Sequence, residues 1–421
     1  MTTTAGDGRG QPLGGLPYRT GWLASARDAL DRPLTSYYLL VGAASLLLTI
    51  GLMEVLSASS VDGLINHGNS YYWFLRQVTW VALALPVTWV VTRMPQRVLR
   101  MFAWPGLFGS VVLLVLTQSP LGVTVNGNRN WLHLGPVLMQ PAEIGKLALI
   151  LWCSHVYARK EKLLRDWRHT VIPVAPVAML VIGLVLAGDD LGTALVLFAI
   201  VLSLLWVVGA PGRLFVGALL SVSVLALYLA TTNSERMLRL TTFTDPFKDY
   251  QGAGWQAAHG IIGMSTGGIF GKGISASQQK WGSLPEAHTD FIFAVLGEEL
   301  GLVGTLLVLA LFLTIAYAGI RIAVRTKDPF VRYMSAGITI WLTTQMMINI
   351  GMVLALLPVI GLPLPLVSYG GSSLLPELVA VGLLVSFARS EPGARAALRA
   401  KRRRRTAAGV TADGGITRRG R

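Results

Sequence analysis

Three side chains that can take up or release a proton stand close together just before a long apolar stretch. Glu286, His288 and Asp290 lie within residues 284–293, where a loop is expected to turn into a helix. A carboxylate placed there can accept a proton from an attacking hydroxyl group. Alternatively, Thr289 or Asp290 caps the helix and satisfies free backbone N–H groups. The segment thus contains either a general base or an ordinary helix start.

Basic and amide side chains occur near this segment in the sequence. They are Lys272, Gln278, Gln279 and Lys280 just upstream and, in the polar stretch 126–131, Arg129. Cations can hold a departing phosphate while a carboxylate takes the proton of the nucleophile, which favours a reaction on a lipid that carries a diphosphate. A helix N-terminus lowers a carboxylate pKa, whereas burial or nearby Glu286 raises it, so the sequence leaves the pKa of Asp290 open.

The composition is that of a membrane protein. Of 421 residues, 53% are hydrophobic and 14% are charged, whereas soluble domains usually have about 25% charged residues. Apolar stretches long enough to cross a hydrocarbon core of about 30 Å recur along the chain. The predicted spans are 36–56, 74–92, 101–117, 142–157, 171–188, 191–209, 214–231, 291–317, 334–357 and 371–388. We therefore predict an all-α polytopic membrane protein of about ten transmembrane helices.

The basic residues between spans fall on one predicted face, which is cytoplasmic by the positive-inside rule. They are Arg93, Arg97, Arg100, Arg159, Lys160, Lys162, Arg165, Arg168, Arg213, Arg321, Arg325 and Lys327. The tails, 1–35 and 389–421, lie on that face and are predicted to be disordered, outside a transmembrane domain at 36–388. The basic run 401–405 either attaches to anionic lipids or docks a cytoplasmic partner. The net charge of +15 therefore reflects membrane topology and does not indicate nucleic-acid binding.

The opposite, outer face carries polar segments that are too long for simple turns. These are 57–72, 118–140 and above all 233–290. The last one contains many apolar residues and glycines, so we expect short helices on the outer membrane face. The first 35 residues lack the apolar core of a signal peptide and are read as a retained tail. The single cysteine, Cys153, excludes an intramolecular disulfide and a zinc site built from cysteines.

Charged side chains inside apolar spans cost a few kcal/mol each and therefore need partners. Glu143 and Lys146 are three residues apart, which places them on one helical face. They form a structural ion pair, or else Lys146 gives positive charge to a cavity for an anionic headgroup. The sequence leaves both interpretations open.

Further glutamates lie in or beside predicted spans. Glu298 and Glu299 face directions about 100° apart, so one of them is expected to pack against a polar or cationic group. Glu54 lies near the outer end of the first span and is expected at the membrane interface. Glu377 follows Pro376 in the last span, and the sequence identifies no partner for it.

The chain resembles the SEDS family, the FtsW, RodA and SpoVE-type polymerases, along most of its length. The matching segments are, in order, Asn126 and Gly127 with Trp131, 139–146, 190–193, 267–273, 284–301, Gln345 with 349–352, and 361–373. Three departures stand out. Asp189 replaces a proline that is frequent in the family, Asn130 stands where many members have arginine, and Pro376 with Glu377 interrupts a span that is usually less polar.

The resemblance implies a ten-helix fold and a peptidoglycan glycosyltransferase that uses lipid II, with Asp290 as the essential catalytic residue. The 4-hydroxyl of the acceptor's N-acetylglucosamine would attack the anomeric carbon of the donor's N-acetylmuramic acid and expel undecaprenyl diphosphate. Asp290 would be the general base. Candidates for holding the diphosphate are Arg129, Lys146, Lys272 and Lys280, and further candidates for substrate contact are Glu143, Glu286, His288, Ser368 and Ser372. No cofactor is required by the sequence, although a divalent cation, Mg²⁺ or Mn²⁺, is an option.

The tails favour the division branch of the family over the elongation branch. A place at the division septum and partnership with a class B penicillin-binding protein, a transpeptidase, and with other division proteins are then expected. Two other classes of function stay open. A lipid II flippase would need a cavity that opens to both membrane faces, whereas the polar and acidic residues concentrate on the outer side. A non-enzymatic scaffold would not need Asp290.

Overall fold

The computed structural model describes residues 32–125, 127–135, 137–164, 166–231, 234–394 and 396. Its helices are α2 (Thr35–His67), α3 (Tyr72–Arg93), α4 (Gln96–Met101), α5 (Ala103–Thr117), α6 (Pro141–Lys160), α7 (Trp167–Val171), α8 (Ala175–Ala187), α9 (Leu191–Val208), α10 (Gly212–Thr231), α11 (Ser234–Thr242), α12 (Trp255–Gly267), α13 (Ile292–Arg325), α14 (Pro329–Val353) and α15 (Leu374–Ala388). The strands are β1 (Gly122–Val125), β2 (Asn128–Leu134) and β3 (Val137–Met139). Short 3-10 helices are η1 (Glu161–Leu163) and η2 (Gly371–Ser373).

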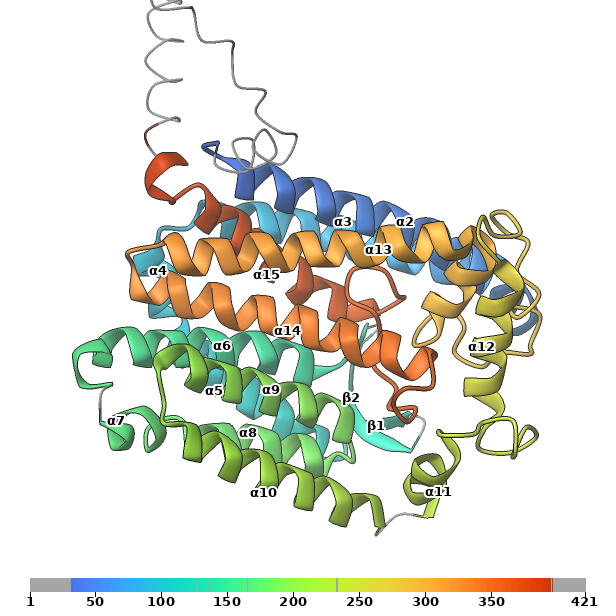
Figure 1. Cartoon of the computed structure of the whole chain (residues 1–421), viewed down its shortest axis with the longest axis horizontal. Helices are drawn as coiled ribbons and strands as arrows, with labels where there is room; N and C mark the ends of the chain where they lie inside the picture. Colours follow the sequence, from blue (N-terminus) through green and yellow to red (C-terminus); the bar gives the residue numbers. More distant parts are fainter. Residues whose placement is uncertain are drawn as a thin grey trace, which may run out of the picture.

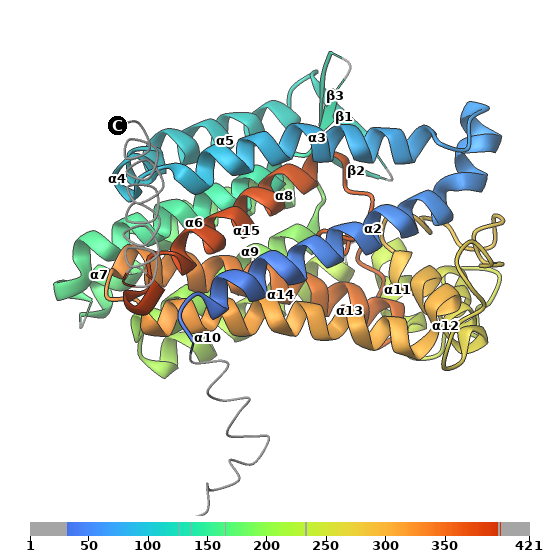
Figure 2. The ribbon, with the colours of Figure 1, turned by 90° about the horizontal axis from the view of Figure 1, so that it is seen from above.

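The long helices run side by side as one bundle (Figures 1 and 2). α13 packs against α14 and α2, α14 against α6 and α9, and α15 against α3. Most of the side chains of α14 and α15 are buried among the other helices. Outer helices instead expose large apolar side chains, as Leu219, Leu220 and Val224 do on α10. An apolar outer surface of this kind suits a lipid environment.

The prediction of a polytopic membrane protein is confirmed. Each predicted span contains a helix, and seven helices among the described residues are long and apolar enough to cross a membrane. They are Thr35–His67, Tyr72–Arg93, Trp167–Ala187, Leu191–Val208, Ile292–Arg325, Pro329–Val353 and Gly371–Ala388. α5 and the apolar part of α10 are shorter, and α6 carries Glu143 and Lys146. The count of ten spans therefore stays a prediction.

The first helix is longer than the sequence suggested. α2 continues to His67 and takes up most of the segment that was expected to be a polar loop. Glu54 consequently lies inside the bundle, with 1% of its surface exposed. Whether Glu54 lies at the membrane interface stays a prediction, and the helix continues beyond the apolar stretch from which its end was predicted.

A small sheet occupies part of 118–140, which the all-α prediction did not include. β1 pairs antiparallel with β2, and β2 with β3, with Leu132 opposite both Gly122 and Met139. The sequence held a hairpin signal in Asn126 and Gly127, which follow the β-branched run 123–125 and precede a run that contains Trp131 and Leu132. The rest of the described chain is helices and loops.

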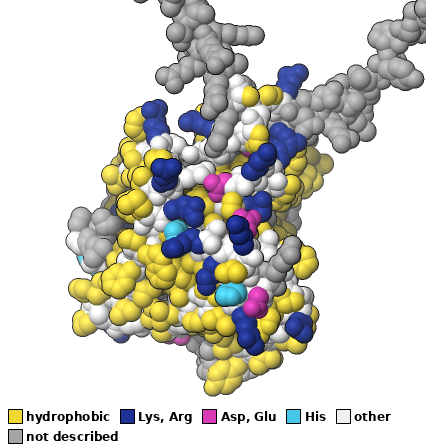
Figure 3. All heavy atoms as spheres, turned by 90° about the vertical axis from the view of Figure 1, so that its left-hand side faces the viewer, with side chains coloured by type: hydrophobic (Ala, Val, Ile, Leu, Met, Phe, Trp, Pro, Cys, Tyr) yellow, Lys and Arg dark blue, Asp and Glu magenta, His cyan; other side chains and the backbone are white. Residues whose placement is uncertain are grey.

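One end of the bundle is basic. Figure 3 looks onto this end and shows many Lys and Arg side chains over it. Arg93 ends α3, Arg159 and Lys160 end α6, and Arg325 ends α13. The other end holds α11, α12 and the sheet (Figure 1). Residues 1–31, most of the C-terminal tail with the run 401–405, and Arg165 lie outside the described residues.

The long segment 233–290 contains short helices, as expected. α11 and α12 lie within it, and the chain between α12 and α13 is a series of turns. α12 packs against the first part of α13. The polar and acidic residues singled out above are thereby brought to the end of the bundle that lies opposite the basic end.

Candidate active site

Asp290 lies in the turn that leads into α13. Its main-chain oxygen accepts a hydrogen bond of 2.8 Å from Nδ2 of Asn349 on α14. Its carboxylate faces Gly361, where an added Cβ would come within 3.3 Å of Oδ2. Gly361 also has a positive φ of 79°, which glycine adopts without strain. Among the described residues the carboxylate of Asp290 has no hydrogen-bond or ion-pair partner, so it is available to a ligand.

Burial raises the pKa of the Asp290 carboxyl to about 7, and the negative charges of Glu286 and Asp190 add to this rise. The guanidinium of Arg239 on α11 opposes it. Burial therefore outweighs the helix dipole, which the sequence could not decide. A carboxyl group with a pKa near neutrality exchanges its proton readily at physiological pH, as a general base must.

Thr289 and Asp290 do not cap α13. The residue at the N-cap position is Phe291, and no side chain caps this helix. Thr289 instead donates from Oγ1 to Oε2 of Glu286 at 2.5 Å. The main-chain oxygen of Glu286 accepts from the N–H of Phe291 at 3.1 Å. The capping interpretation is wrong, because the chain enters the helix through a tight turn around Glu286.

His288 packs between aromatic rings. Its ring lies 5.2 Å from that of Trp73 and 5.7 Å from that of Tyr369, measured between centroids. Burial lowers the pKa of His288, and Glu286 and Asp62 oppose this shift. Its main-chain oxygen accepts from the N–H of Tyr369 at 2.9 Å. His288 therefore joins the Asp290 loop to the segment before α15.

Asp190 is a carboxylate near Asp290 that the sequence analysis left out of the candidate site. Its oxygens accept hydrogen bonds from Asn130 Nδ2 at 2.7 Å, Gln140 Nε2 at 3.2 Å and both the N–H and Oγ1 of Thr193 at 2.9 and 2.8 Å. Asn130 is the residue that stands where arginine was expected. Asp190 thus caps α9 and ties the sheet to it. The motif at 190–193 was a signal for this position.

The segment 362–368 is buried although it is not helical. Backbone groups in such a position need internal partners. Side chains from other elements supply them. The bonds are Asn349 Nδ2 to Leu362 O at 2.7 Å, Gln345 Nε2 to Pro363 O at 3.1 Å, Leu364 N–H to Ser368 Oγ at 2.8 Å, Leu366 N–H to Glu377 Oε2 at 2.8 Å, and Gln77 Nε2 to Ser368 O at 3.1 Å. This segment directly follows Gly361, which the Asp290 carboxylate faces.

One of these side chains, Glu377, has the partner that the sequence did not identify. This partner is the N–H of Leu366, whose φ of 63° is unusual for a residue other than glycine. Ser368 is buried and holds the turn, and Ser372 is buried and accepts from the N–H of Gln140 at 3.0 Å. Contact of Ser368 and Ser372 with a substrate stays a prediction.

Glu143 and Lys146 form a buried ion pair. Nζ of Lys146 lies 2.8 Å from Oε1 of Glu143 and 2.8 Å from Oε1 of Gln345. Gln345 lies one helical turn from Asn349, so this pair lies about one turn deeper in the bundle than the Asp290 backbone. The structural ion pair is therefore present. A role in substrate binding stays a prediction for both residues.

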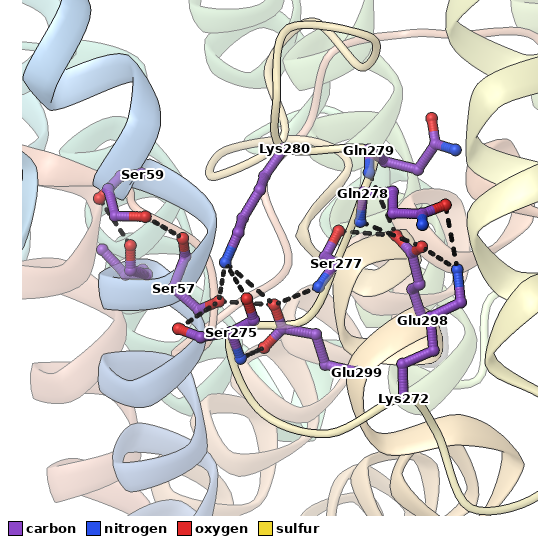
Figure 4. A network of polar contacts seen from close by, with 12 residues as sticks. Ser57, Ser59, Lys272, Ser275, Ser277, Gln278, Gln279, Lys280, Glu298 and Glu299 are labelled. Atoms are coloured by element: carbon purple, nitrogen blue, oxygen red, sulfur yellow. Dashed lines mark hydrogen bonds and ion pairs between the residues drawn. The ribbon is translucent and has the colours of Figure 1, made fainter.

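Lys272 and Lys280 contact the glutamates of α13 (Figure 4). Nζ of Lys272 lies 2.7 Å from Oε1 of Glu298, and Nζ of Lys280 lies 3.7 Å from Oε1 of Glu299. Both glutamates are fully buried, so each has a cation, where the sequence led us to expect a partner for only one. Arg129 is exposed in β2 and donates from Nη2 to the main-chain oxygen of Ser119 at 2.9 Å.

Arg239 is a cation that the sequence analysis missed. It lies on α11, is exposed and acts on the charge of Asp290. Its helix is strongly amphipathic and follows the last residues of α10 closely, which was the available signal. Asp290, Glu286, Asp190 and Arg239 thus come together from three separate parts of the chain.

Comparisons with known proteins agree with this architecture. The FtsW/RodA/SpoVE family model, described as a cell cycle protein, matches residues 37–392. A protein of Mycobacterium tuberculosis named probable peptidoglycan glycosyltransferase FtsW is 42% identical over 374 residues, which is 89% of this chain and 71% of that protein. The protein of the same name from Aeromonas salmonicida is 36% identical over 369 residues. The match covers 86% of this chain and 92% of that protein.

Solved structures show the same fold. The rod shape determining protein RodA of Thermus thermophilus is 27% identical, with a TM-score of 0.62 over 84% of this chain and 97% of that chain. A chain in a structure titled as the structural coordination of polymerization and crosslinking by a peptidoglycan synthase complex is 28% identical, with a TM-score of 0.68 over 83% of this chain and 97% of that chain. The chain therefore belongs to the FtsW/RodA/SpoVE family of polytopic membrane proteins.

Proposed function

We propose that this chain is a peptidoglycan glycosyltransferase that polymerises lipid II, and that Asp290 is its general base. One observation carries the assignment of the base: a carboxylate without a partner among the described residues, with a pKa near 7, stands at the end of the bundle opposite the basic end. Relatives named peptidoglycan glycosyltransferase support the reaction class.

The reaction is the one that the family resemblance implies. The 4-hydroxyl of the acceptor's N-acetylglucosamine forms a bond to the anomeric carbon of the donor's N-acetylmuramic acid. Its proton moves to the Asp290 carboxylate, and the bond between that carbon and the diphosphate oxygen breaks, so the electron pair leaves on undecaprenyl diphosphate. The proton then passes from Asp290 to water. Activity should rise with pH up to about 7, because only the deprotonated carboxylate accepts a proton.

A cation near Asp290 would stabilise the charge that develops on the diphosphate. Arg239 is exposed and lies within electrostatic range of Asp290, which favours it for this task. Lys280 is buried and directed toward Glu299, and Lys272 is partly buried against Glu298, so both are less suited. Lys146 and Arg129 stay candidates, Lys146 from within the bundle and Arg129 from the sheet.

The described part of the chain holds no group of three His, Cys, Asp or Glu side chains that could hold a metal ion. A divalent cation such as Mg²⁺ or Mn²⁺ would then be held mainly by the diphosphate of the substrate, as is usual for Mg²⁺.

A partner and a location follow from the same proposal. A related chain occurs in a peptidoglycan synthase complex of polymerization and crosslinking, which supports a class B penicillin-binding protein as the crosslinking partner. Relatives named FtsW favour the division branch over the elongation branch. We place the basic end and both tails in the cytoplasm, by the positive-inside rule, and the protein at the septum.

The test is reconstitution with the partner transpeptidase and lipid II in vesicles, comparing wild type with Asp290→Ala. Loss of a general base should slow glycan synthesis by about 10²–10⁴-fold. Asp328→Asn is a matched control, since Asp328 caps α14 at the opposite end of the bundle. Strands from both proteins would overturn the assignment of Asp290. Lipid II transfer without strands would favour the flippase, and neither activity in wild type would favour the scaffold.

A further inference from the structure

Helix α13 is interrupted close to its beginning. Gly301 has φ 67° and ψ −164°, a conformation that only glycine adopts readily. The break separates a short first part, 292–300, from the long part that follows. Asp290 lies just before the short part, and Glu298 and Glu299 lie at its far end. The short part therefore connects the proposed base to a pair of buried carboxylates.

The backbone of the preceding loop fills the break. Lys272 and Gly273 donate from their N–H groups to the main-chain oxygens of Glu298 and Glu299, each at 3.0 Å. After the break, Leu302 and Val303 donate to the oxygens of Gly268 and Ile269 at 2.9 and 3.1 Å. An added Cβ at Gly301 would come within 2.3 Å of the nitrogen of Gly271. Loop residues 268–273 thus satisfy backbone groups that the interrupted helix leaves free.

The two carboxylates collect further hydrogen bonds from the same loop (Figure 4). Glu298 accepts from Ser277 Oγ at 2.6 Å and from the N–H groups of Gln278 and Gln279 at 3.1 and 3.3 Å. Glu299 accepts from the N–H groups of Ser275 and Ser277 at 2.8 and 3.3 Å. Hydrogen bonds to carboxylates are stronger than those between neutral groups, so this stretch of loop is held firmly.

Two lysines complete the arrangement. Lys272 pairs with Glu298, and Lys280 approaches Glu299 while donating to Ser275 O at 2.7 Å and Ser57 Oγ at 3.3 Å. Ser57 of α2 also donates to Glu299 at 2.6 Å. We call Glu298, Glu299, Lys272 and Lys280 the carboxylate clamp. It joins the loop, α13 and α2 at one point.

The clamp fixes both ends of the loop that carries the proposed base. The chain leaves the clamp at Lys280 and returns through Asp290 to the short helix that bears Glu298 and Glu299. Within this loop, Leu284 donates to Gln279 O at 3.0 Å, and Phe291 packs against Gly260 of α12. A loop with both ends held has few conformations open to it. The direction of the Asp290 carboxylate should therefore depend on the clamp.

We propose that the carboxylate clamp positions Asp290 for catalysis, with Glu299 and Lys280 as its central pair. These are positioning residues, since they act through the loop and do not touch the reacting atoms. The inference rests on the proposed function, because it takes Asp290 as the base. A displacement of about 1 Å at a reacting group can slow a reaction about 10²-fold. We therefore expect loosening of the clamp to lower kcat and to leave KM within about two-fold.

The experiment measures glycan synthesis by the full chain with its partner transpeptidase and lipid II in vesicles. The variants are Glu299→Gln, Lys280→Met and the conservative Lys280→Arg. We expect kcat to fall about 10²-fold in the first two and to recover at least in part with arginine, which keeps the charge. The control is Glu161→Gln, which removes an exposed pair with Arg332 at the basic end, and it should leave kcat unchanged.

The pH profile supplies a readout that a purely structural role would not move. If the clamp sets the surroundings of Asp290, the acidic limb of the rate profile should shift in Lys280→Met. The proposal would be overturned if Lys280→Met kept both the pH–rate profile and the kcat per folded molecule of the wild type. Where Lys280→Met does not fold, Lys272→Met serves instead, since Lys272 keeps 27% of its side chain exposed. The same outcomes apply to it.

Failure of this inference is distinguishable from failure of the proposed function. If Asp290→Asn is inactive while the clamp variants keep wild-type kcat, the clamp is structural and the base stands. If Asp290→Asn keeps wild-type kcat, the proposed base falls whatever the clamp variants do.

Discussion

Two groups of buried Glu and Lys residues in this protein are assembled differently. Glu143 and Lys146 belong to one helix, and their charges meet at 2.8 Å with both side chains almost fully buried. The carboxylate clamp joins residues that are 19–26 positions apart in the chain, and Lys272 remains partly exposed. The first pair is therefore enclosed within the bundle. The second ties a loop at the end of the bundle to a helix.

The two groups differ in how many hydrogen-bond donors each carboxylate would keep if its lysine were removed. Oε2 of Glu143 has no hydrogen-bond partner among the described residues, so this group depends on Lys146 for its compensation. Glu299 keeps three donors besides Lys280, from Ser57, Ser275 and Ser277. We infer that the enclosed pair contributes mainly to stability and that the clamp contributes mainly to the position of a loop.

The largest effect on stability is expected for Lys146→Met. Removing one partner of a buried ion pair typically costs about 3–5 kcal/mol, because an uncompensated charge stays behind. Lys280→Met should cost about 1–3 kcal/mol, since other hydrogen bonds to Glu299 remain. Thermal unfolding in detergent measures both. Adding Glu143→Gln to Lys146→Met should restore much of the loss, and equal losses at the two lysines would contradict the distinction.

Asp290 differs from both groups because it has no cation within bonding distance among the described residues. Its pKa is raised to about 7 in the folded protein from about 4 in an unfolded chain. The folded state therefore binds more protons between these values, and its stability falls as pH rises from about 4 to about 7. Asp290→Asn removes this effect, so the variant should be more stable than wild type by up to a few kcal/mol above pH 7.

The measurement for Asp290→Asn is the difference in melting temperature from wild type at a series of pH values. The difference should be smallest near pH 4, grow until about pH 7 and then stay constant. A difference that is independent of pH would show that Asp290 titrates with an ordinary pKa and would weaken its assignment as a base.

Gly301→Ala tests whether the break in α13 is required by the clamp. The positive φ strains any other residue by about 1–3 kcal/mol, and the added methyl group meets the backbone of Gly271. We expect a loss of stability of that order together with a fall in kcat. Gly109→Ala on α5 is the matched control, because open space surrounds that position. Equal behaviour of the two variants would speak against a structural need for the break.

The smallest effect is expected at the basic end. Glu161 and Arg332 form an exposed pair at 3.3 Å, and exposed pairs contribute about 0–1 kcal/mol. Glu161→Gln should therefore lower the free energy of unfolding by at most about 1 kcal/mol, measured by thermal unfolding. The change should vanish at high salt, which screens exposed charges. A larger loss would mean that exposed charges stabilise this protein as much as the buried ones.

The sequence predicted most of the helices, because apolar stretches of membrane length are a strong signal. The prediction failed where polar residues lie in a helix or a sheet instead of a loop. α2 continues through polar residues to His67, and a small sheet forms in a stretch that was taken for a loop. The segment 362–368 stood out in the sequence only through the family resemblance. Its burial could not be predicted, because the side chains that bond its backbone come from α3, α14 and α15.

The candidate site was predictable to different degrees. Asp290, Glu286 and His288 stand together in the sequence, so their proximity was evident. Asp190 and Arg239 join them only through the fold, and no local spacing indicates this. Lys272 and Lys280 pair with Glu298 and Glu299, which no local spacing indicated, and their role in holding a ligand stays a prediction.

By itself, the sequence determined that the chain is a membrane protein and that Glu143 and Lys146 share one helical face, since a helix places residues three apart on one face. The tertiary structure alone decided which charged side chains have an ion-pair or hydrogen-bond partner and which have none among the described residues. Compensation depends on groups that are distant in the chain and on burial, and both exist only once the helices have packed. Asp290 has its raised pKa for that reason.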